Sequence, residues 1–298
     1  MKIRLKIIFL ILIIVALITA FAVLLSRDNV AVLHPQGDIA TKERNLMLIT
    51  VLLGVIVIIP VFTMLFTIAW KYRADNTKAK YEPEWDHSRL FETIWWGVPC
   101  VIILVLGVIT WQAAHTLDPY KQLDSKAKPI NVQVVALQWK WLFIYPEEQI
   151  ASVNMVQFPE DRPINFQITA DAPMNSFWIP KLGGQIYAMS GMSTNLHLIA
   201  DHIGEYAGSS ANISGEGFAG MKFTAKATSE ADFDAWVNTT KQSSNMLDMT
   251  EYTKLASPSK DVSPKTYMLM QNDLYDKIVM KYMAPESKNQ QMNHMEMQ

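Results

Sequence analysis

The sequence predicts a membrane-anchored chain in which a transmembrane helical hairpin precedes an all-β domain of the sandwich or barrel class with a helical C-terminal extension. Half of the 298 residues are hydrophobic and only 18% are charged. The long apolar runs all lie within residues 1–114, and a period of two begins near Pro129. This distribution excludes a fully soluble enzyme and a polytopic transporter. Residues 115–298 carry 15 basic and 20 acidic side chains (15 − 20 = −5), so we expect no nucleic-acid partner, because an acidic surface repels phosphates.

Two apolar segments predict the helices of a transmembrane hairpin over residues 46–114. The first covers residues 46–70 and contains no charged side chain, and the second covers residues 93–114. A helix needs roughly 20 apolar residues to cross the hydrocarbon core of a bilayer. Pro60 and Pro99 lie inside these segments and are tolerated where neighbouring groups satisfy the freed carbonyls.

The charge of the connecting loop predicts the orientation of the hairpin. Basic residues accumulate on the cytoplasmic side of membrane proteins, and the loop contains five of them: Lys71, Arg73, Lys78, Lys80 and Arg89. We therefore expect this loop in the cytoplasm and everything after His115 on the opposite side of the membrane.

The N-terminal residues 1–26 leave two alternatives open. Three basic residues precede 19 uncharged residues from Ile7 to Leu25. The small residues around Ala22 predict a secretory signal peptide that is cleaved there. A run of this length also suits an N-terminal anchor that stays in the membrane.

Strict alternation of apolar and polar residues predicts half-buried antiparallel strands in residues 128–228. The alternation is clearest over residues 130–134, 164–168 and 221–225. Several such strands with Pro-, Gly- and Asn-rich connections predict a β-sandwich or barrel.

Residues 229–284 predict a helical, aromatic-rich extension. Ser229 is a suitable N-cap with Asp232 three residues later. Apolar side chains then recur at helical spacing in two stretches: Phe233, Trp236 and Val237, then Leu274, Ile278, Val279 and Tyr282. The polar residues 285–298 predict a disordered tail.

Several motifs in this order resemble subunit II of the haem-copper respiratory oxidases. They are Gln138-Trp139-Lys140-Trp141, the run from Met174 to Gly183, and the run from Tyr206 to Met221. His87, Glu92 and Trp95 at the start of the second hairpin helix add to the resemblance, which covers essentially the whole chain. It implies a cupredoxin-like Greek-key barrel after the hairpin.

The resemblance also implies where a dinuclear copper centre lies in the cytochrome c oxidase branch of this family. That centre uses two bridging Cys thiolates, two His, a Met and a Glu carbonyl, and soft thiolates are required to bridge two coppers. In this sequence the matching positions hold Asn175, Ser210, Asn212, Ser214, Phe218 and Met221. The only cysteine is Cys100, in an apolar run. We expect no copper centre and no other metal site in this chain.

This pattern resembles the quinol oxidase branch, and most of all the cytochrome bo-type ubiquinol oxidases. The resemblance implies a subunit without catalytic residues of its own, in a complex that oxidises ubiquinol, reduces oxygen to water and translocates protons. The haems, copper and ubiquinol are then expected in subunit I. The implied partners are subunit I, further oxidase subunits and membrane lipid, with the chain crossing the bacterial inner membrane more than once and its β domain in the periplasm.

Three residues are candidates for a role in such a complex. By resemblance, Glu92 matches a carboxylate at the entrance of a proton-uptake channel, although a Glu near a helix N-terminus is also favoured by the helix dipole. Trp139 and Trp141 match an aromatic cluster that receives electrons in copper-bearing relatives. Without copper, we expect these two side chains to serve in packing or subunit contact.

Two other functions compete with this interpretation. A true cytochrome c oxidase subunit conflicts with Asn175, Ser210, Ser214 and Phe218. A stand-alone extracytoplasmic binding or sensor domain on a membrane hairpin conflicts with the complete order of the motifs and with Glu92 in the hairpin.

Overall fold

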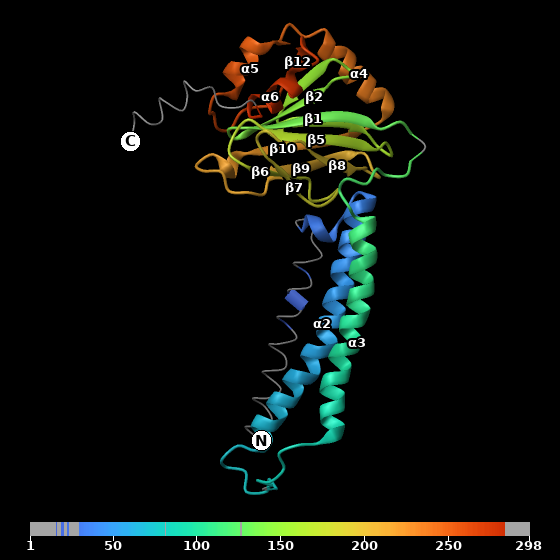
Figure 1. Cartoon of the computed structure of the whole chain (residues 1–298), viewed down its shortest axis with the longest axis vertical. Coiled ribbons are helices and arrows are strands. Elements are labelled where there is room, and N and C mark those ends of the chain that lie inside the picture. Colours follow the sequence, from blue (N-terminus) through green and yellow to red (C-terminus); the bar gives the residue numbers. More distant parts are fainter. Residues whose placement is uncertain are drawn as a thin grey trace, which may run out of the picture. The chain divides into compact units, whose positions relative to one another are not determined.

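The computed structural model describes residues 30–80, 82–125 and 127–283, together with positions 16, 19, 20 and 23 (Figure 1). The chain forms two compact units: Lys42–Asp118, and Met1–Thr41 with Pro119–Gln298. Apart from those four positions, the predicted signal peptide or anchor over residues 1–26 lies outside the described residues. The predicted tail 285–298 lies wholly outside them.

Two long apolar helices confirm the predicted hairpin segments. Helix α2 spans Asp38–Lys71 and helix α3 spans Arg89–Thr116, and each is long and apolar enough to cross a membrane. Both begin several residues before the predicted positions 46 and 93. The apolar run marks only the part of a helix suited to lipid, whereas the helix itself continues through polar residues at its start.

The residues just before α2 and its first turn belong to the β unit. Main-chain hydrogen bonds hold them there, one of them from the N–H of Ala40 to the carbonyl of Leu182 (3.2 Å). The N–H of Gln36 donates to the carbonyl of Lys181 (2.7 Å), and the N–H of Asp201 donates to the carbonyl of Gln36 (2.9 Å). A Cβ atom at Gly37 would lie 2.3 Å from the carbonyl oxygen of Ile199. Only glycine permits this close approach, so the sequence just before the helix is built for this contact.

The β unit consists of two sheets (Figure 1). The seven-stranded sheet has the order β11-β12-β3-β2-β1-β5-β8 and the five-stranded sheet the order β4-β10-β9-β6-β7. The strands are β1 (Ile130–Leu137), β2 (Lys140–Tyr145), β3 (Ile150–Val153), β4 (Met155–Pro159), β5 (Ile164–Ala170), β6 (Asn175–Trp178), β7 (Ile186–Ala188), β8 (Thr194–Leu198), β9 (Gly204–Ser210), β10 (Lys222–Thr228), β11 (Met246–Leu247) and β12 (Lys265–Leu269).

The three strands predicted from alternation are present as β1, β5 and β10, but the expectation of purely antiparallel pairing was wrong. Strand β1 is antiparallel to β2 and parallel to β5, and β10 is antiparallel to β9 and parallel to β4. Alternation reports which face of a strand is buried and is silent about the direction of its neighbour. The chain passes from the first sheet to the second at Asn154, whose φ is +55°.

The main core lies between the two sheets and is rich in aromatic rings. Phe177 of β6 and Phe223 of β10 stack with centroids 5.1 Å apart, and Phe166 of β5 lies 5.2 Å from Phe177. A second core covers the opposite face of the seven-stranded sheet, where Val135 and Leu142 are among the residues that pack beneath the extension. The seven-stranded sheet is therefore buried on both faces, which explains why residues 134–137 form an unbroken apolar run.

The C-terminal extension contains helices α4 (Glu230–Lys241), α5 (Met249–Ala256) and α6 (Leu274–Lys281). As predicted, Ser229 caps α4, because its Oγ accepts a hydrogen bond from the N–H of Asp232 (3.1 Å). The extension is not purely helical, which corrects the prediction: β12 pairs with β3 and β11 pairs with β12. These strands are too short to show a clear period of two. The combination of two membrane-length helices, a β domain and a C-terminal extension is confirmed.

Two buried charged side chains fasten the extension to the sheet. Lys140 of β2 donates hydrogen bonds from its Nζ to the carbonyls of Leu255 (2.8 Å) and Ser257 (2.7 Å) at the end of α5. Ammonium groups are favourable at this end of a helix because the last carbonyls carry partial negative charge. Burial lowers the pKa of Lys140, so these carbonyls are its main compensation for lost hydration.

Asp171 provides the second fastening. Its side chain is only 3% exposed. It accepts hydrogen bonds from Tyr252 of α5 (2.5 Å), from Lys281 of α6 (2.7 Å) and from the Tyr282 hydroxyl. Burial on its own raises the pKa of Asp171, but the three hydrogen bonds outweigh it and hold the pKa below its ordinary value. The hydrogen bond to Asp171 in turn raises the pKa of Lys281.

We expect the attachment of α5 and α6 to weaken in acid. Because the pKa of Asp171 is lower in the folded chain, its stabilisation is complete above the unfolded-chain pKa of about 3.9 and is lost as the pH falls through the folded value. Lys281 acts in the opposite direction and loses its contribution only above about pH 10.4. Hydrogen exchange of residues 249–256 and 274–281, corrected for its intrinsic pH dependence, measures this.

The variant Asp171→Asn assigns the acid effect to one group. It removes charge-assisted hydrogen bonds worth about 1.5–3 kcal/mol, so exchange in α5 and α6 at pH 7 should rise roughly 10- to 150-fold. The acid-dependent loss should then disappear. Asp234→Asn, on the exposed face of α4, is the matched control and should change neither. An unchanged acid transition in Asp171→Asn would refute the assignment.

Candidate functional site

The positions that match copper ligands lie around the loop between β9 and β10. Asn175 begins β6, Ser210 ends β9, and Met221 immediately precedes β10. Asn212 and Ser214 lie in the loop itself, and Phe218 begins a short 3-10 helix, η2 (Phe218–Gly220). Strand pairing of β6 and β10 with β9 brings Asn175, Ser210 and Met221 to one end of the five-stranded sheet.

A network of neutral hydrogen bonds occupies this end of the sheet. The Ser210 hydroxyl donates to Oδ1 of Asn175 (2.7 Å), and the Ser210 N–H donates to the carbonyl of Met221 (3.1 Å). The Asn175 amide donates to the carbonyl of Pro173 (2.7 Å), and the Asn212 amide donates to the carbonyl of Met174 (2.9 Å). The buried polar groups of Asn175 and Ser210 are thus paired within the protein.

These residues do not fit a dinuclear copper centre. Bridging ligands must be soft and anionic, whereas the Ser210 hydroxyl is neutral and already bonded to an amide oxygen. Phe218 offers no lone pair, and Met221 is buried in the main core. In the part of the chain that the structure describes, no group of three or more His, Cys, Asp or Glu side chains is placed to hold a metal ion.

Trp139 covers the loop. Its Nε1 donates to the carbonyl of Ser214 (3.0 Å), and a Cβ atom at Gly217 would lie 2.3 Å from its ring. Its φ is +64°, a conformation that is uncommon for a bulky residue. Lys260 of the extension lies 5.4 Å from the ring centroid and forms an ion pair with Glu216 of the loop (2.5 Å). Sequence reasoning missed Gly217, Lys260 and Glu216, since neither composition nor spacing marks them.

Trp141 lies in a different environment. Its ring is fully buried in the main core, 5.4 Å from Phe177 and 5.8 Å from Phe223. Trp139 lies in the turn just before β2 and packs against the edge of the same core. The location of Trp141 agrees with a packing role, and Trp139 remains the half-buried member of the pair.

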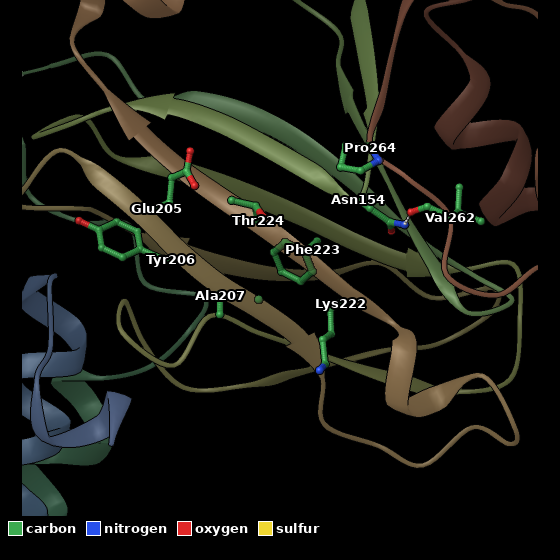
Figure 2. A pocket seen from close by; sticks show the side chains of 10 residues that line it. Asn154, Glu205, Tyr206, Ala207, Lys222, Phe223, Thr224, Val262 and Pro264 are labelled. Carbon is green, nitrogen blue, oxygen red and sulfur yellow. Dashed lines mark hydrogen bonds between the residues drawn. The ribbon is translucent and has the colours of Figure 1, made fainter. Parts of the chain in front are cut away.

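A surface groove of about 370 Å³ lies between the loop-bearing sheet and the extension. Figure 2 shows side chains of β9 and β10, among them Glu205 and Lys222, with Val262 and Pro264 of the extension at one side. Its lining mixes small, charged and apolar side chains without a convergent set of catalytic groups. The groove is thus a boundary between two parts of the β unit.

Glu92 lies in the first turn of α3, within the helical unit. Its carboxylate accepts a hydrogen bond from the N–H of Ser88, the N-cap residue (3.1 Å). A cavity of about 120 Å³ lies beside this turn and is lined by residues 85–88, Phe91 and Trp95. At its rim, a hydrogen bond from His87 lowers the pKa of Asp86. This position of Glu92 is compatible with two roles. The carboxylate can stabilise the helix N-terminus, and it can exchange protons with water.

Known proteins resemble the chain over most of its length. Subunit 2 of the cytochrome bo(3) ubiquinol oxidase of Pseudomonas aeruginosa is 50% identical over 261 residues, which are 88% of this chain and 79% of that protein. The Pseudomonas putida protein of the same name is 52% identical over 87% of this chain and 82% of its own length. The chain belongs to the ubiquinol oxidase subunit 2 family.

Other comparisons match a shorter segment of the chain or are more distant. The model described as "COX Aromatic Rich Motif" matches residues 241–286, which include β11, β12, α5 and α6. Quinol oxidase subunit 2 of Bacillus anthracis is 38% identical over 77% of this chain and 79% of its own length. The periplasmic domain of subunit II of the cytochrome oxidase of Bradyrhizobium japonicum matches with a TM-score of 0.37 and 22% identity, covering 39% of this chain and 96% of that domain.

We expect Ser210 and Ser214, which the resemblance matches to Cys positions, to respond differently to truncation. Ser210→Ala leaves the Asn175 Oδ1 acceptor buried and loses a hydrogen bond, at a cost of about 1–3 kcal/mol. Ser214→Ala should be neutral or stabilising, because the Ser214 Oγ is buried without a hydrogen-bond partner among the described residues. Hydrogen exchange of residues 208–222 measures both variants. Equal effects of the two substitutions would contradict this account of the loop.

Proposed function

We propose that this chain is the second subunit of a quinol-oxidising haem-copper terminal oxidase, a complex that couples ubiquinol oxidation and oxygen reduction to proton translocation. The observation that supports this most directly is the loop between β9 and β10. There the Ser210 hydroxyl and the Asn175 amide bond to each other, so the loop offers no electron-accepting centre. Membership of the ubiquinol oxidase subunit 2 family supports the same conclusion.

In this proposal the subunit has no catalytic residues of its own. The haems, the copper and the ubiquinol belong to subunit I, which this chain contacts together with further subunits and membrane lipid. The apolar and exposed surfaces of α2 and α3 suit lipid and partner helices. In this proposal the chain crosses the bacterial inner membrane more than once, and its β domain lies in the periplasm.

Glu92 is proposed to serve at the entrance of a proton-uptake path on the cytoplasmic side. Its carboxylate is half-buried at the N-terminus of α3 and accepts a hydrogen bond from the N–H of Ser88. A carboxylate held in this way can pass protons between bulk water and a partner subunit.

The choice of electron donor tests the proposed function. The purified complex should consume oxygen with ubiquinol and should fail to do so with reduced cytochrome c, because the loop has no centre to accept its electrons. Oxygen uptake with each donor, in the same preparation, measures this. Turnover with cytochrome c alone would overturn the proposal, and the absence of a stable haem-containing partner would favour a stand-alone sensor.

Substitution of Glu92 tests its role in proton uptake. Glu92→Ala should lower oxygen consumption by about 100-fold without changing the yield of assembled complex. Glu84→Ala, in the same loop and exposed, is the matched control and should retain full activity. If Glu92→Ala reduces assembly alone, or leaves turnover unchanged, the residue acts only at the helix terminus.

A further inference from the structure

Three methionines gather where β11 pairs with β12 in the extension. Met246 of β11 is the register partner of Met268 of β12. Met270 follows two residues later, and its N–H donates to the carbonyl of Leu247 (3.1 Å), which continues the ladder. The side chains of Met246 and Met270 are 50% and 52% exposed, and Met268 is half-buried.

The pairing places these methionines on one face of the sheet. Leu247 and Leu269, the next register pair, are both buried in the second core. Because successive side chains of a strand point to opposite faces, Met246, Met268 and Met270 share the other face. Paired residues lie about 4.8 Å apart between strands, and residues two apart along a strand lie roughly 6.6 Å apart.

This spacing suits convergence of the three sulfur atoms. A methionine side chain has three rotatable bonds and a polarisable thioether, so it adapts to an irregular site. Neutral soft ligands select soft monovalent ions such as Cu(I) over hard divalent ones. Packing alone does not explain why two of the three side chains are half exposed, because an exposed apolar side chain contributes little to the free energy of folding.

We propose that Met246, Met268 and Met270 form a thioether site for a soft monovalent metal ion, and that the ion bound in the cell is Cu(I). The site is independent of the proposed oxidase function and of the loop between β9 and β10. No covalent change of the protein is involved: the ion exchanges its solvent ligands for three sulfur atoms.

Methionine oxidation footprinting with Ag⁺ tests the site residue by residue. The purified membrane complex is treated with hydrogen peroxide with and without stoichiometric Ag⁺, which mimics Cu(I) but is stable to redox change. Mass spectrometry follows each sulfoxide. Oxidation of Met246, Met268 and Met270 should slow together by about tenfold, because a metal-bound thioether is not free to react. Met174 and Met192 are similarly exposed and should be unaffected.

The variant Met268→Leu separates a shared site from three individual side chains. It conserves volume, so the fold should be kept, and retained exchange protection of β12 verifies this. Protection of Met246 and Met270 by Ag⁺ should then be lost, because the central ligand is missing. The control Met192→Leu should leave that protection intact.

Joint protection that disappears in Met268→Leu supports the proposal. It is overturned by no protection by Ag⁺, by equal protection of Met174 and Met192, by protection of only one or two of the three, or by joint protection that survives in Met268→Leu. Protection confined to Met292, Met295 and Met297 near the C-terminus would also overturn it and assign metal binding to that segment.

Discussion

The hydrogen bonds of two buried charges, Lys140 and Asp171, connect the extension to the β domain, and the burial of the seven-stranded sheet on both faces depends on them. Without the extension, the second core beneath it, including Val135 and Leu142, would be exposed to water. Burying a charge is costly unless several hydrogen bonds replace its hydration. Lys140 receives two carbonyls and Asp171 receives three donors, so the charges fix where the extension lies while apolar burial supplies the attraction.

The same extension also contacts the loop between β9 and β10 and the tryptophan that covers it. Asn154, at the crossing between the sheets, accepts a hydrogen bond from the main-chain N–H of Trp141 and donates one to the carbonyl of Val262 in the extension. Lys260 lies over Trp139 and pairs with Glu216 of the loop. The extension therefore contributes a cation–π contact and an ion pair to the surroundings of the loop.

Sequence patterns predict the parts of this structure that are local. Alternation locates β1, β5 and β10, and the capping signal at Ser229 locates the start of α4. The fastening of the extension could not be predicted in this way, because Asp171 and Lys281 are separated by 110 positions. Lys140 lies in the motif Gln138-Trp139-Lys140-Trp141, but nothing in that motif predicts that its ammonium group bonds to α5. The site positions were predicted through resemblance, which named Asn175 and Ser210 but gave no reason for their hydrogen bond.

Ser210 and Ser214 show that the two serines of this loop are held in different ways. The Ser210 hydroxyl donates a hydrogen bond to Oδ1 of Asn175 inside the sheet. Ser214 keeps a buried hydroxyl without a partner among the described residues, while its carbonyl holds Trp139. An unpaired buried hydroxyl costs about 1–3 kcal/mol. The main-chain carbonyl of Ser214, and not its hydroxyl, positions Trp139. The unpaired hydroxyl therefore lowers stability without being needed for the conformation of the loop. The conformation of the loop therefore depends on the Ser210–Asn175 hydrogen bond and on the main-chain contact with Trp139.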